Sequence, residues 1–186
     1  MTFQDILDFW FGASDAATRG RPRREWFRKD DAFDAAIRER FLAGYEAAAA
    51  HHLSAWEDTP YAALALVIVL DQFPRNMFRG EPRAFATDAR ALTVARRLVD
   101  RGFDRHYLVS ERSFAYLPFE HAEDAAAQRR ALALFEALGE PGGLDYARRH
   151  QEIIARFGRF PHRNAILGRP SAPEEVEFLR QPGSGF

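Results

Sequence analysis

Two stretches of the sequence place arginine, asparagine and histidine in a similar order, and these side chains could bind an anion. The first, LDQFPRNMFRGEP, runs from Leu70 to Pro82, and the second, FGRFPHRNAILGRP, runs from Phe157 to Pro170. Once His162 is treated as an insertion, Phe-Pro, Arg-Asn, Gly and Pro fall at matched positions in both. Arginine suits carboxylate and phosphate recognition because its planar guanidinium group donates two parallel hydrogen bonds. We call these stretches the first and the second RN segment.

The matched residues also have a structural interpretation, as a device that ends one helix and starts the next. Phe before Pro is pushed out of the helical region, Asn tolerates left-handed backbone, Gly supplies a positive φ, and Pro restarts the chain. Turn chemistry does not require arginine, so it leaves Arg75 and Arg163 unexplained. We therefore predict that Arg75 and Arg163, with Asn76 and Asn164, lie near each other across one polar centre.

A site built from these segments has a ligand-binding set and an acid–base set. The ligand-binding candidates are polar residues of the two RN segments: Asp71, Gln72, Arg75, Asn76, Arg79, Arg159, His162, Arg163, Asn164 and Arg169. The acid–base candidates are His121, Glu123 and His150. The opposing interpretation is that the arginines pair with acids of the protein itself, such as those in PFEHAED. The sequence leaves both interpretations open.

Asp71 is expected at the C-terminal end of the most apolar helix, which we predict over residues 60–73. Burial and the helix dipole both disfavour a negative charge there, so the carboxylate needs a positively charged partner. Arg75, Arg79 or an arginine of the second RN segment can supply it. A structural ion pair and a catalytic role are both open for this residue.

A metal site is a further hypothesis, because His121, Glu123, His150 and His162 could converge as ligands for zinc or iron. A histidine on the apolar face of a helix, such as His150, is more often a hydrogen-bonded core residue. The sequence contains no H-E-x-x-H, G-x-S-x-G, P-loop or G-x-G-x-x-G pattern, so the common hydrolase and nucleotide-binding mechanisms lack their motifs. We predict no metal ligand set and leave the cofactor unknown.

Composition restricts the partners of the protein. The 186 residues include 26 basic and 27 acidic side chains, and this balance gives no positive field that would hold a nucleic acid. The longest apolar stretch, YAALALVIVL, is too short to cross a membrane, and the first residues lack the pattern of a signal peptide. The absence of cysteine excludes disulfides and thiolate chemistry. We expect a cytoplasmic protein whose partner is a small anionic or polar molecule, with a protein partner not excluded.

Helical periodicity dominates the sequence and strand alternation is nearly absent. Apolar residues recur at helical spacing in stretches near residues 31–52, 60–73, 83–102, 122–139, 144–158 and 172–179. Short connections rich in Pro and Gly make neighbouring helices antiparallel. We predict a single all-α domain over residues 1–186, a compact array of antiparallel helical hairpins around the buried helix. A diverged internal duplication would pair residues 60–90 with 144–180, and residues 181–186 would be a frayed tail.

Several longer blocks resemble domain-of-unknown-function family 924, from about Phe3 to Leu179; they include DFWFG, LDQFPRNMFRG, FAYLPFEHAED and YARRHQEIIARFGRFPHRNAILGR. The resemblance implies a bacterial protein with a tetratricopeptide-like α-α superhelix, and it implies no known reaction. It adds Asp88, Pro118 and Gln128 to the residues already named. One departure is Ala122, where the family usually has serine between His and Glu, which argues against a serine nucleophile.

The sequence leaves three functional hypotheses. The first is a polar Arg/Asn/His pocket that binds a small anionic or polar ligand, with or without acid–base chemistry. The second is a tetratricopeptide-like scaffold that binds a protein partner. The third is a metal-dependent enzyme with histidine and carboxylate ligands. We favour the first, because so many of the polar motif residues gather at expected helix ends of an apolar scaffold.

Overall fold

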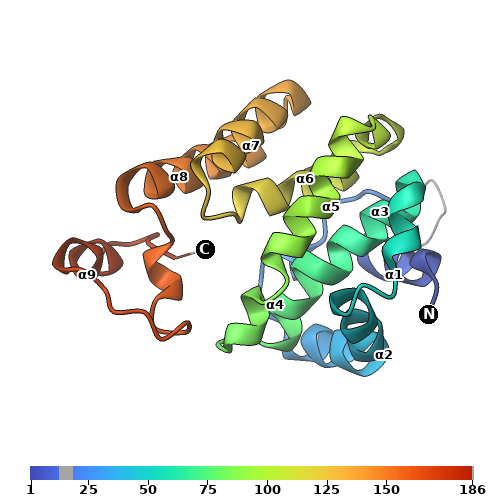
Figure 1. The fold of residues 1–186 in the computed structure, drawn as a ribbon, viewed down its shortest axis with the longest axis horizontal. Coiled ribbons are helices and arrows are strands. Elements are labelled where there is room, and N and C mark those ends of the chain that lie inside the picture. Colours follow the sequence, from blue (N-terminus) through green and yellow to red (C-terminus); the bar gives the residue numbers. More distant parts are fainter. Residues whose placement is uncertain (13–18, 186) are drawn as a thin grey trace.

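The computed structural model describes residues 1–12 and 19–185, and these residues form helices and turns without any strand (Figure 1). This confirms the predicted all-α class. The α-helices are α1 (Phe3–Phe11), α2 (Asp31–Ala49), α3 (Pro60–Val67), α4 (Phe73–Met77), α5 (Asp88–Asp100), α6 (Val109–Glu120), α7 (Ala125–Leu138), α8 (Pro141–Phe157) and α9 (Pro173–Leu179). None of the helices described is long and apolar enough to span a membrane.

The helices pack as the predicted array of hairpins around a central helix. Helix α3 is apolar on all sides, its residues 62–67 are all buried, and it contacts α1, α5 and α6. Helices α6, α7 and α8 pack against one another in succession and form the other half of the array, which Figure 1 shows in yellow to orange. The buried helix predicted near residues 60–73 is therefore the centre of the fold.

The central helix does not end before Pro74, as the sequence predicted, but continues through this proline. Residues Ile68–Gln72 form a π-helical turn, and α4 follows with Pro74 near its start. Proline has no N–H for the carbonyl of Leu70, and its ring would collide with that oxygen in a regular α-helix. The wider turn accommodates the ring, and the Leu70 carbonyl accepts a hydrogen bond from Thr87 Oγ1 at 2.6 Å instead. The two RN segments consequently differ in backbone, because the second follows the end of α8 with a short 3-10 turn.

The C-terminal part of the chain has a small hydrophobic cluster of its own. Ile153 and Ile154 of α8 and Phe160 of the second RN segment form its buried centre, and Phe157 and Phe178 pack against them. This cluster is separate from the main core that surrounds α3. The frayed tail predicted for residues 181–186 stays a prediction, and Phe186 lies outside the described residues.

Candidate functional site

The site is built around Asp71, which is fully buried within the π-helical turn. Its carboxylate accepts hydrogen bonds from Nδ1 of His121, 2.9 and 3.0 Å from the two oxygens, and from Nε2 of Gln72 at 2.6 Å. Nη1 of Arg75 lies 3.4 Å from Oδ1. Burial alone would raise the pKa of Asp71, but Arg75 and His121 hold that pKa well below its usual range. Asp71 is therefore an ionised acceptor, and Arg75 is its arginine partner.

His121, at the C-terminal end of α6, has one ring nitrogen that is bonded to Asp71 and one for which the described part of the chain supplies no partner. Because ionised Asp71 can only accept, Nδ1 of His121 carries the proton and Nε2 presents a lone pair. No described residue forms a hydrogen bond with Nε2, and the side chain is 15% exposed. Burial, followed by the charge of Arg75, lowers the pKa of His121, so its ring is neutral near pH 7.

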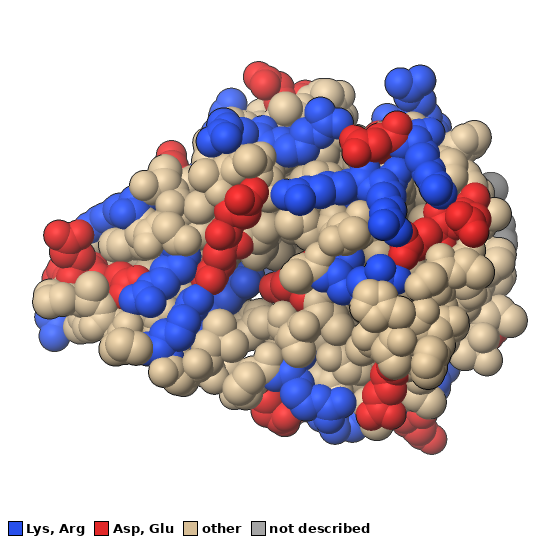
Figure 2. Space-filling view, in the orientation of Figure 1, with Lys and Arg blue, Asp and Glu red and all other residues tan. Residues whose placement is uncertain are grey.

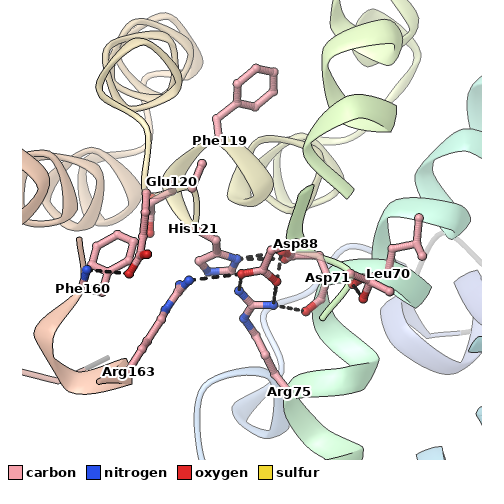
Figure 3. A network of polar contacts seen from close by, with 12 residues as sticks. Leu70, Asp71, Arg75, Asp88, Phe119, Glu120, His121, Phe160 and Arg163 are labelled. Carbon is pink, nitrogen blue, oxygen red and sulfur yellow. Dashed lines mark hydrogen bonds and ion pairs between the residues drawn. The ribbon is translucent and has the colours of Figure 1, made fainter. Parts of the chain in front are cut away.

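Asp88 joins the two RN segments at the first residue of α5. Arg75 donates two hydrogen bonds to Asp88 at 2.8 and 3.0 Å, and Arg163 donates one at 3.2 Å. Figure 3 shows both guanidinium groups beside Asp88, next to the His121 ring. The structure thus brings Arg75 and Arg163 together. We call the group of Asp71, Arg75, Asp88, His121 and Arg163 the polar centre.

The two asparagines, in contrast, lie apart and each contacts a different carboxylate. Asn76 donates to Asp34 of α2 at 2.7 Å, and Asn164 donates to Glu175 of α9 at 3.2 Å. Each of these carboxylates also receives a bidentate arginine. The five arginines predicted to clamp an anion all have carboxylate partners: Arg75 with Asp71 and Asp88, Arg79 with Asp34, Arg159 with Glu175, Arg163 with Asp88, and Arg169 with Glu123.

Glu123, named as an acid–base candidate, holds the second RN segment in place. It accepts two hydrogen bonds from Arg169, at 2.6 and 2.9 Å, and one from the backbone N–H of Phe160 at 2.8 Å. Such a fully bonded carboxylate is a poor proton acceptor. Among residues 1–12 and 19–185, no three His, Asp or Glu side chains are arranged to hold a metal ion. The structure therefore does not bring His121, Glu123, His150 and His162 together as a ligand set.

A second buried acid–histidine pair lies beside the polar centre. Oε1 of Glu120 is 3.2 Å from Nδ1 of His150, which also contacts the carbonyl of Tyr146 at 2.9 Å. Glu120 is only 3% exposed, and its Oε2 has no hydrogen-bond partner in the described structure. Burial, and then the charge of Asp71, raises the pKa of Glu120 to about 8, whereas burial lowers the pKa of His150 to about 3. Both groups are therefore neutral near pH 7.

Gln128 fixes the backbone on either side of His121. This fully buried residue of α7 donates from Nε2 to the carbonyls of Glu120 at 2.6 Å and Ala122 at 2.8 Å. Carbonyls at a helix C-terminus have no partner within the helix, so a buried amide donor is an effective substitute. Gln128 thereby sets the direction in which the His121 side chain leaves α6.

The surface is hollowed where the two halves of the molecule meet. Figure 2 shows this hollow between the second RN segment with α9 on one side and α4 with α5 on the other, with acidic and basic side chains around it. The Arg163–Asp88 ion pair of the polar centre connects the second RN segment with α5. Two other hollows, of about 170 and 210 Å³, are lined by residues of the 24–30 segment and of α7 and α8, and not by the polar centre.

Sequence reasoning did not place Asp88 or Glu120 in the site. An acid at the first position of a helix is commonly explained by its favourable interaction with the helix dipole. Nothing in the sequence therefore indicated that Asp88 is shared by Arg75 and Arg163. Asp88 was named only through the family resemblance. Glu120 lies directly before His121, but no helix was predicted over residues 109–120, so the burial of the Glu120 side chain could not be inferred.

A comparison with protein families matches residues 6–183 to the family described as "Bacterial protein of unknown function (DUF924)". The chain belongs to the DUF924 family. A solved structure of a protein of unknown function from Agrobacterium tumefaciens is 45% identical to this DUF924 chain, with a TM-score of 0.87 over 95% of this chain and 96% of that one. No curated protein gives a significant match. The resemblance seen in the sequence is thus confirmed.

The buried titratable groups of this DUF924 protein give its stability a defined pH dependence. Burial lowers the pKa of His121, of His150 to about 3 and of His162 to about 4, while the unfolded chain takes up these protons near pH 6.5. Below pH 6.5 the unfolded state therefore binds more protons than the folded state. Each histidine then lowers the free energy of unfolding by up to about 1.4 kcal/mol for every pH unit of acidification. Glu120 acts in the opposite direction, because the folded state retains its proton up to about pH 8.

We expect the free energy of unfolding to be highest near pH 6.5 and to fall on both sides. Urea unfolding at pH 5 to 9 measures it. Glu120→Gln is the matched control, since a neutral amide should abolish the decline between pH 6.5 and 8 and leave the acid-side decline intact. Constant stability between pH 5 and 6.5 would contradict the assignment of neutral buried histidines.

Proposed function

We propose that this DUF924 protein binds a small anionic ligand in the hollow beside the polar centre and carries out acid–base chemistry on it through His121. The observation that carries the proposal is the pairing of His121 Nδ1 with a buried, ionised Asp71, which leaves Nε2 without a partner among the residues that the structure describes. Because Asp71 fixes the tautomer of the ring, Nε2 is available to accept a proton from a ligand.

Arg163 is the group best suited to contact the anion. It is 6% exposed and makes one ion pair, with an Asp88 that already receives two hydrogen bonds from Arg75. Its Nε has no hydrogen-bond partner among the described residues. The rings of Phe85 and Phe160 lie 4.7 and 4.5 Å from its central carbon and hold the guanidinium group in place. An incoming oxyanion would satisfy donors that the protein leaves unused.

The Asp71–His121 pair is suited to proton transfer. The carboxylate fixes the tautomer with the proton on Nδ1 and stabilises the imidazolium that forms when Nε2 takes a proton from a ligand. The lowered pKa of His121 keeps Nε2 unprotonated near neutral pH. Arg75 compensates the charge of Asp71, so the buried carboxylate can stay ionised without a ligand.

The scaffold hypothesis remains the second candidate. Its support is an exposed aromatic side chain, Phe27, which is 76% exposed, together with the exposed Leu108 and Val109 at the start of α6. Contiguous apolar patches on a protein surface mark interaction sites, whereas single exposed apolar side chains are common. A binding surface for a protein partner would not explain the buried polar network, so we place the scaffold hypothesis second.

Thermal denaturation with a panel of small anions tests the proposed function. A ligand of the site at one hundred times its dissociation constant should add about 2.7 kcal/mol to the free energy of unfolding. The effect should disappear in Arg163→Gln. It should persist in Arg79→Gln, the matched control, because Arg79 belongs to the first RN segment but pairs with Asp34 away from the polar centre. Equal stabilisation of both variants, or none of the wild type by any anion, would overturn the proposal.

A further inference from the structure

The unused groups at the hollow differ in hydrogen-bonding character, and this difference specifies the ligand. Arg163 offers N–H donors, with Nε and Nη2 unbonded to any described residue. His121 offers the opposite, a lone pair on Nε2, because Asp71 has fixed the proton on Nδ1. A complementary ligand therefore brings acceptor oxygens for the arginine and a hydroxyl proton for the histidine.

Glu120 is a neutral carboxyl group next to His121 in the chain. Its Oε2 is buried and has no partner, while Oε1 faces Nδ1 of His150 at 3.2 Å. The groups that face Glu120 are Asp71 from the π-helical turn and His150 from α8, and neither contributes a positive charge while His150 is neutral. The protonated carboxyl therefore adds no negative charge that would repel an anion bound near His121.

We infer that the site takes an oxyanion that still carries a hydroxyl group, of which hydrogen phosphate is the simplest, and discriminates against oxyanions without one. This inference rests on the proposed function and adds the chemical class of its ligand. A fully deprotonated anion such as sulfate would direct an oxygen lone pair at the Nε2 lone pair and leave that acceptor unpaired. Sites built to pair a ligand hydroxyl reject analogues that lack it for the same reason.

Sulfate and phosphate provide the test, since both are tetrahedral and phosphate alone keeps an O–H near pH 7. Glycolate and acetate form a second pair, in which the carboxylate is common and only glycolate has a hydroxyl. Isothermal titration at pH 7 should give phosphate at least about tenfold higher affinity than sulfate, or glycolate than acetate, corresponding to one unpaired buried acceptor. A higher affinity for phosphate than for sulfate would identify the ligand as a phosphate, and a higher affinity for glycolate than for acetate would identify it as a hydroxy acid.

The His121→Phe variant removes the acceptor and keeps a ring of similar size. We expect its residual anion binding to lose the discrimination within each pair, while Arg163→Gln should lose binding of all four anions. The ¹⁵N resonance of His121 Nε2 in the wild type should move further with the hydroxyl-bearing member of the discriminated pair than with its partner, so the test does not depend on the variant folding. Equal affinities within both pairs would overturn this inference and leave the proposed function standing. No binding of any of the four would count against both.

Discussion

Replacing Asp71 with alanine is expected to lower the free energy of unfolding by about 3–5 kcal/mol, because removal of one partner strands the other charge in the interior. Arg75 would keep only Asp88, and both Nδ1 of His121 and Nε2 of Gln72 would lose their acceptor. Asp71→Asn should cost less, because the amide keeps the shape and one acceptor oxygen. Urea unfolding at pH 7 gives both values.

Asp100→Ala is the matched control for this substitution. Asp100 is also on a helix and within 3.9 Å of an arginine, but its side chain is 75% exposed, so the change should be within about 0.5 kcal/mol. The Asn variant has a second readout, the ¹⁵N shifts of His121, which should report a larger share of the tautomer with the proton on Nε2. If Asp71→Ala lowers the free energy of unfolding by less than about 1 kcal/mol, the contacts of Asp71 with Arg75 and His121 do not stabilise the fold.

Replacing Phe73 with alanine is expected to cost about 3–5 kcal/mol, from lost burial and the cavity that remains. Phe73 is fully buried at the start of α4, and its ring stacks on Phe41 at 4.9 Å and meets Trp10 edge-on at 5.8 Å. Thermal and urea denaturation measure the loss. The same substitution should broaden the His121 resonances, because Phe73 anchors the chain between Asp71 and Arg75.

Phe27→Ala is the control for the loss of a phenyl ring. Its ring contacts Trp26 and Phe114, but the residue is 76% exposed, so we expect a change below about 1 kcal/mol. A similar loss in the free energy of unfolding for Phe73→Ala and Phe27→Ala would mean that the packing of Phe73 around α4 contributes no more than that of an exposed ring.

The central helix shows what periodicity can predict. Residues 60–73 are so apolar that burial of most of them follows from composition, as the structure shows for residues 62–73, and Thr59 with Pro60 marks the start of α3 where the structure has it. Its end was predicted wrongly, since a proline in a helical pattern normally marks a boundary. The Thr87 hydroxyl that takes the displaced Leu70 carbonyl is seventeen residues away in the chain, and no local pattern contains such a contact.

Helices α1 and α6 were not predicted, and α6 carries the most important residue of the site. It begins without a polar capping side chain at Leu108 and contains Pro118 in its interior, so both boundary signals are misleading. Glu111, three residues further on, accepts the N–H of Leu108 at 3.0 Å, and its burial depends on a long-range ion pair with Arg19 that no local pattern contains. Pairing of Asp71 with Arg75 could be anticipated from burial, whereas its contact with His121 required the tertiary structure.

The separate hydrophobic cluster of the C-terminal part has a consequence for how the protein opens. With three buried apolar side chains among the described residues, this cluster offers far less burial than the core around α3, so the segment after α8 should exchange its amide protons through local opening well before global unfolding. The ion pairs of Arg163 with Asp88 and of Arg169 with Glu123, and the hydrogen bond from the Phe160 N–H to Glu123, are polar contacts across this boundary. A ligand bound by Arg163 and His121 together would connect the C-terminal part with the rest of the molecule. Its binding would slow amide exchange throughout the segment after α8, including residues that the ligand does not contact.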